Sequence, residues 1–187
     1  PDVVGIRVTG KLREGVTATD LVLHVTELLR RVRVGGKLVE FFGPGVSGLP
    51  VTDRATIGNM APEYGATAAL FPVDEETCSY LRATGRTREA VDAVRSYYQA
   101  QQMFGTPEEE RVAYSAVVEL DLEKIEPSVA GPKRPQDRIP LGRLKEEIRQ
   151  VFQKPAQEGG YGRTAEQIAR EYSIPAEAET QKLRANR

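Results

Sequence analysis

The fold is decided by residues 3–42, VVGIRVTGKLREGVTATDLVLHVTELLRRVRVGGKLVEFF. Apolar side chains at Val4, Ile6 and Val8 alternate with smaller or polar neighbours, which predicts a β-strand over residues 3–9. The next apolar residues recur at the spacing of an amphipathic helix packed on a sheet: Leu21, Val25, Leu28, Leu29 and Val32. Residues 37–42 are typical of a second strand. Strand, helix and strand in this order predict a βαβ unit with parallel strands.

The ends of this first helix are marked in the sequence. Thr17 is expected to cap its N-terminus, and Asp20 falls in the first turn, where a carboxylate interacts favourably with the helix dipole. Gly35 and Gly36 are expected to end the helix before the second strand begins.

Helices and strands continue to alternate beyond residue 42. Gly43-Pro44-Gly45 makes a tight loop at the carboxyl end of the second strand, where ligand sites gather in open α/β sheets. The elements expected next are a helix at 51–59, a strand at 67–73, a helix from Asp74 to Gly85, a helix capped by Thr87 and a strand at 114–120. This alternation predicts an α/β fold with a largely parallel sheet.

The character of the chain changes after Leu122. Residues 126–140 contain Pro127, Pro132, Pro135 and Pro140, and such a stretch is typical of an extended connector. A helical stripe then returns at Leu141, Leu144, Ile148, Val151 and Phe152. Few large apolar residues follow, which predicts a polar tail that is flexible or a solvent-exposed helix. We therefore expect an α/β domain over 1–122, a proline-rich connector and helix over 123–152, and a tail over 153–187.

Composition excludes several classes of protein. The 26 basic and 27 acidic residues nearly cancel, which argues against a dedicated nucleic-acid binder. No apolar run approaches the ~20 residues that a membrane helix needs. The single cysteine, Cys78, excludes an internal disulfide and cannot by itself build a zinc or iron–sulfur site. A lone thiol fits a reducing compartment, so we expect a cytoplasmic protein.

Five short stretches carry the functional signal. They are TGKLREG at 9–15, FFGPGV at 41–46, ATIGNMAPEYGAT at 55–67, FPVD at 71–74 and GPKRPQD at 131–137. In order and spacing they resemble the aconitase (aconitate hydratase) family over roughly residues 1–144, and the last is similar to the subgroup of bacterial aconitase A and the iron-regulatory proteins. The resemblance implies an internal fragment of such an enzyme. It also implies a three-layer α/β/α domain of the aconitase iron–sulfur region type, followed by the truncated start of the next domain.

The same resemblance assigns two residues to an active-site wall. The family's Asn-x-x-x-Glu pair falls on Asn59 and Glu63. The resemblance implies that Asn59 lies near the family's iron–sulfur cluster without being a ligand. It also implies that Glu63 belongs to the hydrogen-bond network around the substrate and the catalytic water. An amide can donate to a cluster sulfur, and a carboxylate can share a proton. Pro62 lacks an amide hydrogen and disfavours helical geometry before it, so we expect a kink or helix end between the pair.

The implied reaction needs groups that this sequence lacks. In the family, three cysteines hold a [4Fe–4S] cluster whose open iron binds the substrate, and its cysteine motifs, base serine and substrate-clamping arginines are absent here. The resemblance thus implies a parent hydro-lyase of the tricarboxylic acid cycle that converts citrate to isocitrate through cis-aconitate. No cluster is expected on this chain and no metal ligand is assigned. The chain alone is expected to be inactive without the remaining aconitase domains.

Two alternatives from other classes remain open. The chain could contribute to an RNA-binding cleft of an iron-regulatory-type protein, although its near-neutral charge counts against strong RNA binding by this piece alone. It could also be an inert structural domain.

For the other residues of chemical interest we expect structural roles. His24 is expected to be a half-buried structural histidine, and Cys78 to pack inside a helix. Residues 43–45 do not complete a phosphate-binding signature and are expected to bring backbone close to the cleft. The basic group of Lys133, Arg134 and Arg138 is expected to belong to a solvated linker.

Overall fold

The structure is a computed structural model of the chain, and it describes residues 2–107 and 112–171. The chain divides into two compact units, residues 1–143 and residues 144–187, and each is considered by itself.

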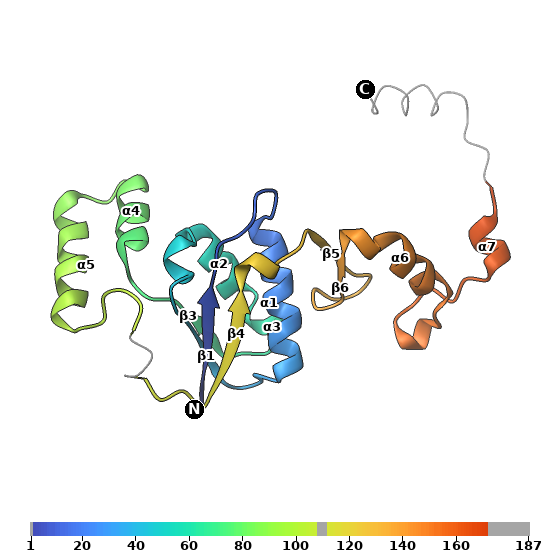
Figure 1. Cartoon of the computed structure of the whole chain (residues 1–187), viewed down its shortest axis with the longest axis horizontal. Coiled ribbons are helices and arrows are strands. Elements are labelled where there is room, and N and C mark those ends of the chain that lie inside the picture. Colours follow the sequence, from blue (N-terminus) through green and yellow to red (C-terminus); the bar gives the residue numbers. More distant parts are fainter. Residues whose placement is uncertain (1, 108–111, 172–187) are drawn as a thin grey trace, which may run out of the picture. The chain divides into compact units, whose positions relative to one another are not determined.

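The first unit is built on a four-stranded sheet, drawn as arrows in Figure 1. Its strands are β1 (Val3–Thr9), β2 (Leu38–Phe42), β3 (Ala68–Leu70) and β4 (Ala116–Asp121), in the spatial order β3-β2-β1-β4. All three neighbouring pairs are parallel, with Val4 of β1 opposite Val39 on one side and Ala116 on the other. The predicted α/β fold with a parallel sheet is therefore confirmed.

Three helices pack together on one face of this sheet: α1 (Ala18–Val32), α2 (Val51–Asn59) and α3 (Ala61–Tyr64). Because side chains alternate along a strand, Val4, Ile6 and Val8 of β1 all point into the same core. They meet the predicted stripe of α1, where Leu21, Val25 and Leu29 are completely buried. Burying each such side chain is worth about 1.5–3 kcal/mol, so this interface stabilises the unit by several kcal/mol.

Helix α1 begins where the sequence predicts and ends earlier. Thr17 and Asp20 form a reciprocal capping box, in which each side chain accepts a hydrogen bond from the other residue's backbone N–H. At the other end Arg33 adopts the left-handed conformation with φ 62°, and its N–H donates to the carbonyl of Leu29. Arg33 thus takes the role that was expected of Gly35 and Gly36.

In the described part of the chain, two further helices lie between β3 and β4. Helix α5 (Arg88–Ala100) is capped by Thr87, as predicted. The helix predicted to open at Asp74 is α4 (Glu75–Ala83), and Asp74 is its cap. The predicted strand over 67–73 shrinks to Ala68–Leu70. Its partner β2 pairs only as far as Glu40 opposite Leu70, and Pro72 has no N–H for a ladder.

The proline-rich stretch contains an antiparallel hairpin where an extended connector was predicted. Strand β5 (Ser128–Ala130) pairs with β6 (Arg138–Pro140), and both strands pack against α1. This hairpin belongs to the same compact unit as the sheet. Short 3-10 turns lie at Val46–Gly48, Leu122–Lys124 and Leu141–Arg143.

The second unit contains α6 (Leu144–Gln153), a 3-10 turn at Ala156–Glu158 and α7 (Ala165–Ala169). Helix α6 confirms the predicted helical stripe. The Phe152 ring lies 5.5 Å from that of Tyr161, and the carbonyl of Phe152 accepts from the Arg163 N–H. The predicted tail runs to residue 187, and its part beyond residue 171 lies outside the described residues. Among residues 2–107 and 112–171, no helix has the length and apolar character needed to cross a membrane.

Candidate functional site

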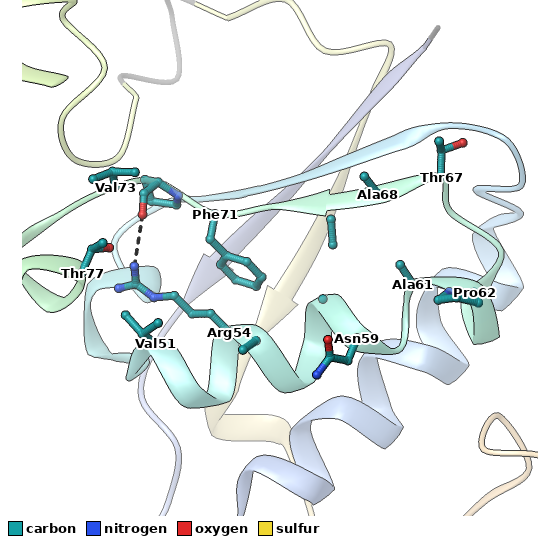
Figure 2. Close-up of a pocket in the computed structure, with 14 residues that line it drawn as sticks. Val51, Arg54, Asn59, Ala61, Pro62, Thr67, Ala68, Phe71, Val73 and Thr77 are labelled. Atoms are coloured by element: carbon teal, nitrogen blue, oxygen red, sulfur yellow. Dashed lines mark hydrogen bonds between the residues drawn. The ribbon is translucent and has the colours of Figure 1, made fainter. Parts of the chain in front are cut away.

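A pocket of about 640 Å³ lies between α2 and β3 (Figure 2). Small and apolar side chains form most of its wall. The lining residues are Val51, Arg54, Ala55, Gly58, Asn59, Ala61, Pro62, Thr67, Ala68, Ala69, Phe71, Pro72, Val73 and Thr77. Most of them belong to the motif stretches at 55–67 and 71–74 that the sequence singled out, so the fold brings two of those stretches to one place.

Asn59 is an exposed residue at the end of α2 that lines this pocket. Met60, with φ −90° and ψ 12°, separates α2 from the single turn of α3, which carries Pro62 in its first turn. The predicted helix end between Asn59 and Glu63 is confirmed. The side chain amide of Asn59 is thus presented at a helix terminus.

Glu63 lies on α3 but does not line the pocket. Its side chain is half-buried, and one carboxylate oxygen, Oε2, is shielded from solvent and has no hydrogen-bond partner among the described residues. Burial, aided by the charge of Glu63, raises the pKa of the neighbouring Tyr64, whose hydroxyl donates to the Ile57 carbonyl at 3.1 Å. The helix break therefore separates the two predicted site residues.

Arg54 and Asp74 form an ion pair at one end of the pocket. The sequence alone did not predict this pair. Arg54 is 4% exposed and Asp74 is 8% exposed. The guanidinium donates to both Asp74 oxygens, Oδ1 at 2.9 Å and Oδ2 at 2.7 Å. It also donates to three carbonyls, those of Val46, Leu49 and Pro72. The hydrogen bond to the Pro72 carbonyl is the dashed line in Figure 2.

This arginine fastens separate parts of the chain to one another. Its partners lie in the turn after β2, in the segment after β3 and at the N-terminus of α4, where Asp74 also accepts from the Thr77 N–H. Such a charge tolerates burial because every donor is satisfied. The signal in the sequence was an arginine three residues before buried Ile57, on the inner side of α2.

Cys78 and the loop at 43–45, which the sequence analysis also considered, have structural roles. Cys78 is fully buried in α4, as expected of a packing residue. Gly43 has φ +94°, and a Cβ there would lie 2.7 Å from the Val8 carbonyl. The loop at 43–45 therefore packs on β1, and the Gly45 N–H donates to the same carbonyl.

His24 and Arg138 lie where α1 meets the hairpin. His24 has a buried Nδ1 without a hydrogen-bond partner in the described part of the chain. Burial, and next the nearby Arg138 guanidinium, lower the pKa of His24. Arg138 donates to Glu27 at 2.7 Å and is largely buried, so it is not part of a solvated linker.

The described residues do not provide the set of ligands that an iron–sulfur cluster needs. They contain no group of three or more His, Cys, Asp and Glu side chains that could hold a metal ion. Cys78 is the only cysteine of the chain and is buried, whereas a cluster takes several thiolates. No chemical step can therefore be derived through such a group from this chain.

Comparison with known protein families matches residues 1–185 to the aconitase family (aconitate hydratase). The chain belongs to the aconitase family. It is 56% identical over 175 residues to the aconitate hydratase A of Thermus thermophilus, a match that covers 93% of this chain and 19% of the relative. It is 52% identical over 171 residues to that of Bacillus subtilis, covering 91% of this chain and 19% of the relative.

Other aconitate hydratases agree with this assignment. The one from Corynebacterium jeikeium is 56% identical over 149 residues, which is 80% of this chain and 16% of the relative. The chain thus spans about a fifth of the length of its aconitase relatives. The resemblance seen in the five sequence stretches is confirmed at the level of the family.

Proposed function

We propose that this chain forms one wall of the active site of a longer aconitate hydratase. The parent is a hydro-lyase that dehydrates citrate to cis-aconitate and rehydrates it to isocitrate. The observation that carries the proposal is the 56% identity to the aconitate hydratase A of Thermus thermophilus over 93% of this chain.

The position of Asn59 supports this proposal. It stands at the exposed end of α2 and on the wall of a pocket, so its amide can reach a group supplied from outside the described residues. In the parent that group is the environment of the [4Fe–4S] cluster, to which Asn59 is a neighbour and not a ligand. An amide that donates to a cluster sulfur tunes the electronic properties of the cluster.

Glu63 supports the proposal through its unsatisfied oxygen. A carboxylate oxygen that is buried without a hydrogen bond is costly, so native proteins nearly always supply a donor. We propose that another region of the parent provides this donor and that the pair holds or moves a proton during dehydration and rehydration. Glu63 lies outside the pocket that Asn59 lines, so this donor would approach it from another side.

The isolated chain is proposed to be inactive. The cluster of the parent supplies Lewis-acid chemistry when bound, and the single buried thiol of this chain offers no set of ligands for it. The remaining aconitase domains would supply the cysteines and the groups that bind citrate.

The deciding experiment measures iron per chain after anaerobic reconstitution with iron and sulfide, together with cis-aconitate hydration by the same sample. A complete aconitate hydratase A, reconstituted in parallel, is the positive control. We expect no stoichiometric iron and no turnover from the 187-residue chain. Stoichiometric iron with turnover would show that the chain builds a complete site of its own and would overturn the proposal.

A further inference from the structure

Three residues of α1 form a polar ladder under the β5–β6 hairpin. Asp20, His24 and Glu27 are spaced by four and three residues, which puts them on the same side of the helix. Asp20 Oδ1 accepts a hydrogen bond of 2.7 Å from the Ser128 N–H of β5. Glu27 Oε2 accepts one of 2.7 Å from Arg138 Nε of β6. The hairpin is thus fastened to α1 by two carboxylates.

The hairpin itself is tied together at the same place. Arg138 Nη1 donates to the hydroxyl of Ser128 at 2.8 Å, so the residue that reaches Glu27 also links β6 to β5. The side chain of Arg138 is 13% exposed. Ile139 of β6 is buried and adds an apolar anchor that carries no charge.

His24 occupies the middle position of the ladder, between the two fastening carboxylates. Its Nδ1 is shielded from solvent and has no hydrogen-bond partner in the described residues. The charged groups around the imidazole are Glu27 and Arg31 on α1, Arg138 on β6 and Glu126 just before β5. A proton on His24 would therefore place a positive charge at a half-buried position beside the Arg138 guanidinium, whose side chain is 13% exposed.

We propose that the β5–β6 hairpin is a strap whose attachment to α1 requires a neutral His24 and which acid therefore releases. The carboxylates of Glu27 and Glu126 would attract the added proton, but Glu27 is already engaged by Arg138 at 2.7 Å and by Arg31 at 3.3 Å. Burial and Arg138 oppose the charge more strongly, which lowers the pKa of His24. A group that binds its proton less tightly in the attached state must weaken attachment when it is protonated.

Release would free a segment that lies near the C-terminal end of the first compact unit. The strap comprises residues 126–140, directly before the second unit begins at Leu144. Attached, these residues are held against α1; released, they lose these contacts. The inference concerns only the contacts of α1 and the hairpin, so it stands independently of the proposed enzymatic role.

His24 is the only histidine of the chain, so its imidazole resonances can be followed by NMR without ambiguity. In the 187-residue chain we expect His24 to titrate below the ordinary value of 6.5. Over the same pH range the Ser128 amide should lose protection from hydrogen exchange, while amides of β1 keep theirs. Each unit by which the pKa is lowered corresponds to an attachment about tenfold weaker when His24 is charged.

Two variants distinguish a hairpin whose attachment depends on neutral His24 from a His24 that is buried without affecting the hairpin. Ile139→Ser loosens the hairpin without altering a charge, and it should return the His24 pKa toward 6.5. His24→Gln cannot titrate, so protection of Ser128 should stay constant from pH 7.5 to pH 5. If Ile139→Ser prevents folding, Ile139→Ala replaces it as the loosening variant, because it too alters no charge. An unchanged His24 pKa in the loosened hairpin, or a loss of Ser128 protection that persists in His24→Gln, would overturn the proposal.

Discussion

The guanidinium of Arg54 and the carboxylate of Asp74 meet through two hydrogen bonds, of 2.9 Å and 2.7 Å, across 20 residues of sequence. Both groups are buried, and the hydrogen bonds of the arginine within the described residues go to backbone carbonyls or to this aspartate. The pair holds the N-terminus of α4 against α2 and the turn after β2. Breaking it should therefore affect the whole unit and not only one helix.

Replacing Arg54 by methionine should destabilise the chain severely. The change leaves the Asp74 carboxylate buried without its counter-charge, which costs about 3–5 kcal/mol. Chemical denaturation followed by circular dichroism measures the loss. Arg95→Met is the matched control, because Arg95 pairs with Glu75 at the surface and its loss should be far smaller. Equal losses in the two variants would contradict the role assigned to Arg54.

Alanine at Gly5 should displace an aromatic ring. A Cβ at this position would lie 2.6 Å from Tyr114 Cδ2 and 2.9 Å from Phe42 Cε1, and these two rings stack with centroids 4.8 Å apart. We expect Gly5→Ala to destabilise by about 1–3 kcal/mol, the usual cost of overpacking.

The matched control is Gly35→Ala, where nothing lies within 4 Å of the added methyl group. Its free energy of unfolding should stay close to that of the wild type. Tyr114→Ala should relieve most of the cost of Gly5→Ala when the two are combined, and strict additivity would count against the steric explanation.

The pH dependence of stability should reveal Asp20. Burial alone would raise the pKa of its carboxyl, but hydrogen bonds from the hydroxyl and N–H of Thr17 and from the Ser128 N–H hold it below the ordinary value of 3.8. A lowered pKa contributes stability that is fully present above pH 3.8 and is lost as the pH falls through the native pKa.

Asp20→Asn provides the comparison. At pH 7 the variant should be less stable by about 1–2 kcal/mol, because a capping carboxylate is lost. The difference from wild type should stay constant down to about pH 4 and shrink below it, as Asp20 itself takes up a proton. A difference that does not change with acidity would exclude the lowered pKa.

In a complete aconitate hydratase of this sequence, Glu63→Gln should lower kcat while the cluster stays bound. Glutamine has nearly the same shape but cannot exchange a proton, and such a loss costs about 10²–10⁴ in rate. Steady-state kinetics with isocitrate and an iron determination on the same sample measure the two properties. Glu76→Gln, at an exposed position of α4, is the control. Unchanged kinetics would remove Glu63 from the mechanism.

The sequence predicts the local elements of this fold well. Alternation in β1, the stripe of α1 and the caps at Thr17 and Thr87 are short-range signals, and each appears at the expected residue. These features depend on backbone geometry and on neighbours within one or two turns. Such signals are visible in a single sequence because they require no knowledge of the rest of the fold.

Features that depend on distant partners were missed. Arg54 cannot be recognised as a buried ion-pair residue before Asp74 is brought to it, and β3 shortens because its length is set by β2. The hairpin at 128–140 escaped prediction because its strands have three residues each and are stabilised by α1. Likewise, the sequence indicated that the helix breaks between Asn59 and Glu63, but not that only Asn59 would face the pocket.

The strand order also has a consequence for the growing polypeptide. Residues of β1 pair with residues of β4 that are 112 positions later in the chain, as Arg7 and Glu119 illustrate. At 5–20 residues per second, a ribosome needs roughly 6–22 s to deliver this partner. During that interval one edge of β1 has no native neighbour, and an open edge can pair with another nascent chain. Arg7, near the middle of β1, places a charge on that edge and disfavours such premature association until β4 emerges.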